Sequence, residues 1–188
     1  MYLPTIKSDL KSVFADYAKE CKGAVDRSYH AMKAQLQPGQ TVPNPGKISP
    51  EMQAEISGPI KALRDKAVGI IDEALEEVKA VKAEAPTTEA VNAIAMLRDA
   101  NSVTEGDLEA LMNEYGATYL AHKAVRDIAH KHKIYAFADH PIVEIEAGLN
   151  TLRHICERDI TLGNAESTAA RGSSGTLFNA SVDLNLPE

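Results

Sequence analysis

The sequence lacks tryptophan and is poor in aromatic residues generally. It has no Trp and three Phe in 188 residues, and aromatic residues make up 5% of the chain although hydrophobic residues reach 44%. The core must therefore be built mainly from Ala, Leu, Ile and Val, and with abundant Glu and Lys this mixture favours helices. A chain of this length forms one large domain or two small ones.

The sequence also has few cysteines, no long apolar run and no surplus of positive charge. Cys21 and Cys156 are too few for a disulfide framework, so a reducing cytoplasm is the expected compartment. No run approaches the roughly 18–20 apolar residues of a membrane span, so no membrane partner is expected. The opening segment MYLPTIKSDLKSVF mixes charged and apolar residues, unlike a signal peptide. The formal net charge of −7 argues against nucleic-acid binding through phosphate neutralisation.

A long apolar stripe near the N-terminus predicts one long helix. Apolar residues recur in steps of three and four from Ile6 to Leu36, the spacing that lines one helix face. We expect this helix to run from about Pro4 to about Gln37. The loop 37–50, QPGQTVPNPGKISP, then ends it, because its prolines and glycines cannot continue a helix.

A second long stripe follows the loop. Ser49 is expected to cap this helix, with Pro50 at the first helical position. Gly58 and Pro59 interrupt the stripe and predict either a kink or a fresh helix start capped by Ser57.

Capping residues mark the shorter helices that come next. Thr87 or Thr88 is suited to cap one helix, and Thr104 with Asp107 three residues later forms a variant of the capping box. Gly116 either stops that helix or breaks it briefly.

These patterns predict an all-α fold in three parts. Residues 1–85 form a long antiparallel helical hairpin around the loop 37–50, since neither helix can bury its apolar face alone. Residues 86–162 form a small helical bundle. Residues 163–188 are rich in Gly and Ser and signal no helix, so they form either an irregular polar tail or a short β-arm that docks on this chain or a neighbour.

The stretch YLAHKAVRDIAHKHKIY, residues 119–135, holds three of the six histidines. Successive residues on a helix turn by about 100° and rise by about 1.5 Å, so His122, His130 and His132 cannot meet at one ion. A metal site here requires the helix to end by about His130. No metal or other cofactor is predicted.

Other candidates for catalysis have structural explanations. His140 lies beside Pro141 and is suited to cap a helix, and Cys21 and Cys156 fall on apolar stripes that suit the core. The segment RGSSGT, 171–176, is neither Gly-x-Ser-x-Gly nor a phosphate-binding loop. The sequence therefore predicts no enzymatic activity.

The same stretch 119–135 also carries four Lys/Arg against one acid. A possible basic interaction face consists of Lys123, Arg126, His130, Lys131 and Lys133. Given the negative charge of the whole chain, such a face would meet an acidic protein surface rather than nucleic acid. The structural alternative is that these cations complement the dipole at a helix C-terminus.

One segment, VTEGDLEALMNEYGATYLAHKAVRDIAHKHKI at 103–134, has a Thr-capped start, an acid-plus-Leu turn, Tyr-Gly, Tyr-Leu-Ala and then an Ala-rich helix. The residues of this pattern are Thr104, Asp107, Leu108, Leu111, Tyr115, Gly116, Tyr119, Leu120, Ala121 and Ala124. The segment resembles small helical proteins from the structural-gene clusters of tailed phages and prophages of Gram-positive bacteria. The resemblance implies a scaffold-like or capsid-associated role in virion assembly, and it supplies no catalytic residues.

The sequence thus favours a non-enzymatic helical interaction protein that self-associates and binds other structural proteins during virion assembly. Its expected location is the cytoplasm of the bacterial host, either free or on the virion. Two alternatives are a bacterial cytoplasmic adaptor or regulator, and a metal-assisted enzyme that uses His122, His130, His132 and His140.

Overall fold

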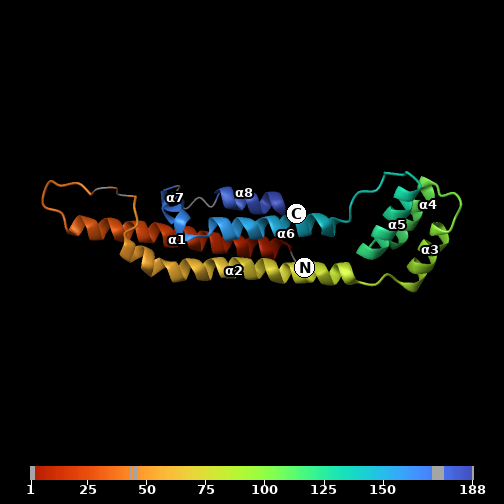
Figure 1. Cartoon of the computed structure of the whole chain (residues 1–188), viewed down its shortest axis with the longest axis horizontal. Coiled ribbons are helices and arrows are strands. Elements are labelled where there is room, and N and C mark those ends of the chain that lie inside the picture. The colour runs from red at the N-terminus through yellow and green to blue at the C-terminus, as the bar shows by residue number, and fades with distance from the viewer. Residues whose placement is uncertain (1–2, 43, 45, 171–175, 188) are drawn as a thin grey trace. The chain divides into compact units, whose positions relative to one another are not determined.

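The described residues of the computed structural model, 3–42, 44, 46–170 and 176–187, form an all-α fold, as predicted (Figure 1). They divide into two compact units, which are described separately. The larger unit takes residues 2–74 and 148–188, and the smaller unit takes Leu75–Ala147. Among the described helices, none combines the length and hydropathy that a membrane-spanning segment requires.

This division differs from the predicted ranges 1–85, 86–162 and 163–188. The helices α2 (Pro50–Ala83) and α6 (Pro141–Asp159) each contribute residues to both units. The spacing of apolar residues predicts such helices, but it does not show that one continuous helix contributes residues to two units.

The larger unit is built from long helices that run lengthwise beside one another (Figure 1). Besides its parts of α2 and α6, it contains α1 (Leu3–Ala34), a short 3₁₀ turn (Leu162–Asn164), α7 (Ala165–Ala170) and α8 (Thr176–Asn185). Its largest fully buried side chains are Leu10, Val13, Tyr17, Ile56, Ile71, Leu149, Leu152, Ile160, Val182 and Leu186. The core is thus aliphatic, as the scarcity of aromatic residues implies.

The long helices begin and end close to the predicted positions. The Ser49 hydroxyl accepts the backbone N–H of Met52 at 3.3 Å, which confirms the predicted cap of α2. The helix then continues through Pro59 without a break, and the Ser57 hydroxyl donates to the carbonyl of Ala54. The alternative of a fresh helix start capped by Ser57 is therefore wrong.

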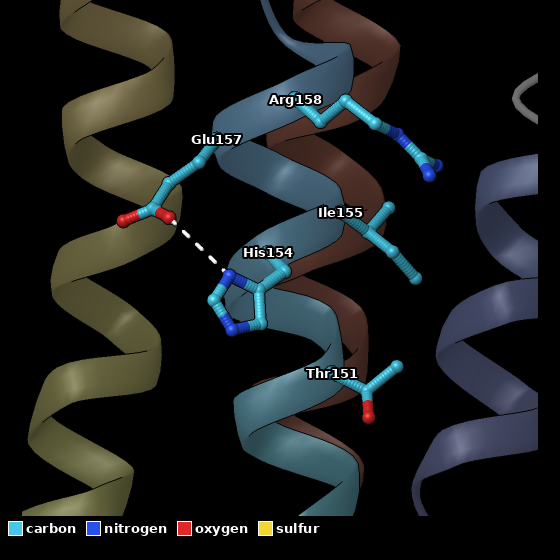
Figure 2. Close-up of a pocket in the computed structure, with 5 residues that line it drawn as sticks. All are labelled: Thr151, His154, Ile155, Glu157 and Arg158. Carbon is cyan, nitrogen blue, oxygen red and sulfur yellow. Dashed lines mark ion pairs between the residues drawn. The ribbon is translucent and has the colours of Figure 1, made fainter.

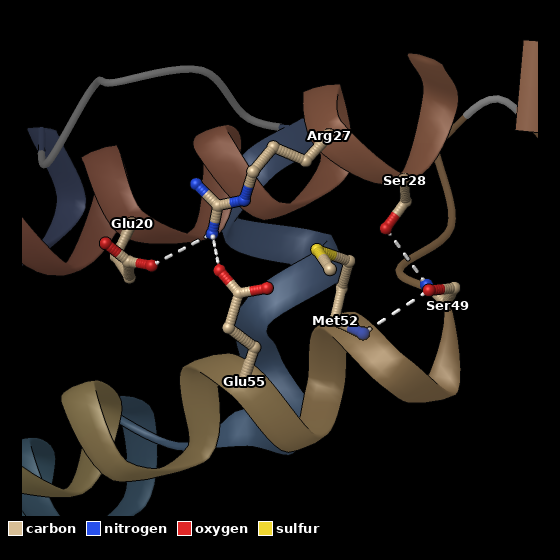
Figure 3. A network of polar contacts seen from close by, with 6 residues as sticks. All are labelled: Glu20, Arg27, Ser28, Ser49, Met52 and Glu55. Atoms are coloured by element: carbon tan, nitrogen blue, oxygen red, sulfur yellow. Dashed lines mark hydrogen bonds and ion pairs between the residues drawn. The ribbon is translucent and has the colours of Figure 1, made fainter. Parts of the chain in front are cut away.

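The end of α1 lies against the start of α2, which forms the turn of the predicted hairpin (Figure 3). The hydroxyl of the fully buried Ser28 accepts the backbone N–H of Ser49 at 3.1 Å. The Arg27 guanidinium lies 3.3 Å from a carboxylate oxygen of Glu20 and 3.3 Å from one of Glu55. These contacts join the two helices beside the predicted loop.

The expectation that residues 163–188 lack helix is wrong in the described part of that range. Phe178 and Val182 form the buried side of α8, and the buried Leu186 continues the spacing of four residues directly after the helix ends. The apparent β-type alternation arose because Leu184, which is 86% exposed, falls between two of them. Residues 171–175, with most of the RGSSGT segment, lie outside the described residues.

The smaller unit contains three short helices, α3 (Thr88–Arg98), α4 (Glu105–Tyr115) and α5 (Tyr119–Lys131). Their starts follow the predicted caps: the Thr87 hydroxyl accepts from Ala90, and Thr104 and Asp107 form a reciprocal capping box. Gly116 ends α4. The core of these helices consists of Ile94, Leu108, Leu111, Ala121, Val125, Ile128 and Ala129.

Candidate interaction site at the end of α5

The C-terminus of α5 ends in a Schellman motif that contains a lysine in place of the usual glycine. The N–H of Lys133 donates to the carbonyl of His130 at 3.0 Å, and the N–H of Ile134 donates to the carbonyl of Ala129 at 2.9 Å. These two bonds close the helix only if Lys133 adopts the left-handed conformation, and its φ is 60°.

The left-handed conformation is unfavourable for a lysine by about 1 kcal/mol. Lys133 nevertheless places a positive charge directly after the helix C-terminus, where the dipole favours cations. Strained backbone of this kind is concentrated at functional sites in proteins. This combination marks the helix end as a candidate site.

An exposed aromatic ring lies among the cations of this helix end. Tyr135 is 76% exposed, and its ring centroid lies 5.6 Å from that of His130. His130, Lys131 and Lys133 are exposed as well. Ile134 on one side of Tyr135 packs against the core of the unit, so the tyrosine is held outward by an anchored backbone. We call His130, Lys131, Lys133 and Tyr135 the basic end of α5.

The predicted basic face also included Lys123 and Arg126, which do not belong to the basic end of α5. Lys123 is exposed on α5, but Arg126 forms an ion pair with Asp139 and its side chain is only 23% exposed. The Lys131 ammonium also donates to the carbonyl of Arg98 at 3.2 Å, which holds this charge at the surface. Arg126 therefore serves internal structure, whereas Tyr135 joins the site although its sequence position gave no signal.

A second polar cluster brings together His122 and His140, which are far apart in the sequence. Their ring centroids are 5.3 Å apart at 89°, and the ring of Tyr119 lies 5.9 Å from that of His140. His140 also caps α6, as predicted, because its Nδ1 accepts the N–H of Ile142 at 3.2 Å. Lys82 lies 5.2 Å from the centre of the Tyr119 ring and pairs with Glu146.

The histidines do not assemble a metal centre. The described residues contain no group of three or more His, Cys, Asp or Glu side chains that could hold a metal ion. α5 continues to Lys131, so His130 lies in the last turn of the helix. His132 follows as the C-cap.

The larger unit has an open depression of about 600 Å³ along α6 (Figure 2). Thr151, His154, Ile155, Glu157 and Arg158 line it, and all five come from one helix. His154 lies 3.7 Å from Glu157, but its side chain is 83% exposed. This pair is therefore open to water.

No family model matches the chain, and comparison with the curated proteins and with the solved structures found no match.

Proposed function

We propose that this protein is a non-enzymatic helical interaction protein that binds acidic protein surfaces through the basic end of α5. The observation that carries the proposal is the exposed Tyr135 among His130, Lys131 and Lys133, held by a strained helix end. Tyrosine and cationic side chains are typical of residues that dominate binding energy at interfaces. Exposed cations also steer an acidic partner into contact.

The proposed setting is virion assembly, and its support is the resemblance of residues 103–134 to helical proteins of phage structural-gene clusters. In the structure, these residues span the α4–α5 pair. The pattern residues Leu108, Leu111 and Ala121 are buried in the core of this unit. They therefore pack the helices that carry the basic end.

We further propose that one acidic partner is a second copy of the chain. The net charge of −7 makes acidic surface plentiful on each copy.

Light scattering over a range of protein concentrations and salt tests self-association. We expect an oligomer that dissociates as salt rises, and the substitution Lys133→Glu should weaken it. The matched control Lys66→Glu makes the same charge change at an exposed position of α2 and should leave it intact. A monomer at every accessible concentration, or equal weakening by both substitutions, would refute the basic end as the contact between copies.

Genome context tests the setting separately. Neighbouring genes for portal, protease and capsid proteins support virion assembly. A chromosomal operon without phage genes favours the cytoplasmic adaptor instead.

A further inference from the structure

Both ring nitrogens of His140 lie against backbone groups of the smaller unit. Nδ1 accepts the N–H of Ile142 at 3.2 Å, so this nitrogen carries no proton. A neutral ring then holds its proton on Nε2, which lies 3.4 Å from the carbonyl oxygen of Ala117. The ring thereby links the start of α6 to the turn between α4 and α5.

A second proton on His140 would break this arrangement. It would attach to Nδ1, directly opposite the N–H of Ile142, so the cap would be lost. The resulting cation would also lie at the positive end of the α6 dipole. Protonation and capping by His140 are therefore mutually exclusive.

His122 forms the second ring of the pair. Its ring meets His140 edge to face at 5.3 Å. Burial, together with the nearby His140 and Arg126, lowers the pKa of His122 below its ordinary value. A proton on His122 places positive charge where burial and the nearby Arg126 oppose it.

Charged and titratable groups on three elements surround the pair. They are Lys82 on α2, Tyr119 and Arg126 on α5, Asp139 just before α6, and Glu144 and Glu146 in its first turns. The cations Lys82 and Arg126 are already paired, with Glu146 and Asp139 respectively. The carboxylates of Glu146 and Asp139 therefore already have cationic partners when the histidines are neutral.

We propose that His122 and His140 form an acid-sensitive clasp, which holds the start of α6 on α5 while both rings are neutral and releases it when either ring is protonated. Residues 132–140 connect α5 to α6, and the clasp holds the end of this connection. Lys133 and Tyr135 of the basic end of α5 lie within it. Mild acid would thus loosen the backbone that positions Tyr135. The clasp itself does not depend on the proposed binding function.

Hydrogen exchange followed by mass spectrometry tests the clasp in the full chain at about pH 7.5 and about pH 5.5, on either side of the ordinary histidine pKa. After correction for the intrinsic exchange rate, protection of the peptide containing Ile142 and Val143 should fall by about tenfold in acid. The substitution His140→Asn keeps a side chain that caps helices but does not titrate, so it should abolish this loss. His154→Gln, at an exposed histidine of the same helix, should leave the loss unchanged.

Peptides from α4 that contain Leu108 and Leu111 report on the core of the same unit and should stay protected at both pH values. The proposal is overturned if wild type shows no loss, or if His140→Asn shows the same loss as wild type. It is equally overturned if His154→Gln abolishes the loss, or if the α4 peptides lose protection in parallel, because the response would then be general unfolding.

Discussion

The hydroxyl of Tyr17 in α1 donates a 2.8 Å hydrogen bond to the backbone carbonyl of Thr161, which lies 144 residues further along the chain. Tyr17 is fully buried, and this burial raises the pKa of its phenol. The bond ties the segment after α6 to α1 in a partly buried place.

Tyr17→Phe removes this donor and leaves the ring in place. We expect a loss of about 1–2 kcal/mol in the free energy of unfolding, because the Thr161 carbonyl loses its partner in a partly buried position. Urea denaturation followed by circular dichroism measures the loss. Tyr29→Phe, at a partly buried tyrosine of the same helix, should change the stability by less than about 0.5 kcal/mol. Equal effects of the two substitutions would show that the Tyr17 bond contributes nothing specific.

Gly148→Ala tests the close packing of α6 against α8. A Cβ at Gly148 would lie 1.7 Å from the carbonyl oxygen of Asn185, so the backbone of α8 must shift. We expect a loss of about 1–3 kcal/mol in the free energy of unfolding, the usual cost of overpacking.

The matched control is Gly69→Ala in α2, where an added Cβ meets nothing within 4 Å. Alanine favours a helix interior, so this substitution should stabilise the protein by about 0.5–1 kcal/mol. If Gly148→Ala were also stabilising, the position of α8 on α6 would be wrong.

Lys133→Gly should stabilise the smaller unit by about 0.5–1 kcal/mol, because glycine adopts the left-handed conformation without the clash of a Cβ. Thermal denaturation should show a higher midpoint. Lys131→Gly, in the last turn of α5, should lower the midpoint, since glycine is unfavourable within a helix. Should Lys133→Gly destabilise the protein instead, the lysine charge would outweigh the backbone strain.

The two thiols offer a chemical test of the core of the larger unit. Cys21 and Cys156 are fully buried, and burial raises their pKa values to about 11 and about 12. We expect neither to react with Ellman's reagent until the protein unfolds, since the thiolate is the reactive form. Ser102→Cys, which introduces a thiol at an exposed position, should add one rapidly reacting group. Rapid reaction of a native cysteine would contradict the buried positions.

Local signals in the sequence predicted most of the helices. Caps such as Thr104 with Asp107 act within four residues, and an apolar stripe acts along one helix, so both are readable without tertiary structure. The same reasoning failed at α8, where two spacings overlap: Val182, Leu184 and Leu186 alternate, while Phe178, Val182 and Leu186 follow a helical stripe.

The candidate sites were harder to predict because they depend on contacts between segments. The sequence places Arg126 in the basic face, whereas in the structure its guanidinium pairs with Asp139. His140 was predicted as a cap, but its contact with His122 depends on the path of residues 132–140. Periodicity along α5 carries no information about that path.

The lowered pKa of His122 predicts how the stability of the smaller unit depends on pH. Above about pH 6.5 the histidine is neutral in the folded and the unfolded chain, so its full contribution to stability is present. As the pH falls below about 6.5, the unfolded chain takes up the proton first, and the free energy of unfolding decreases until the folded form is protonated too.

His122→Gln should therefore reduce the loss of stability between about pH 7.5 and about pH 5.5, measured by urea denaturation at each pH. His30→Gln, at an exposed histidine of α1, should leave the loss unchanged. If His122→Gln kept the full pH dependence, proton uptake at His122 would not be what weakens the fold in acid.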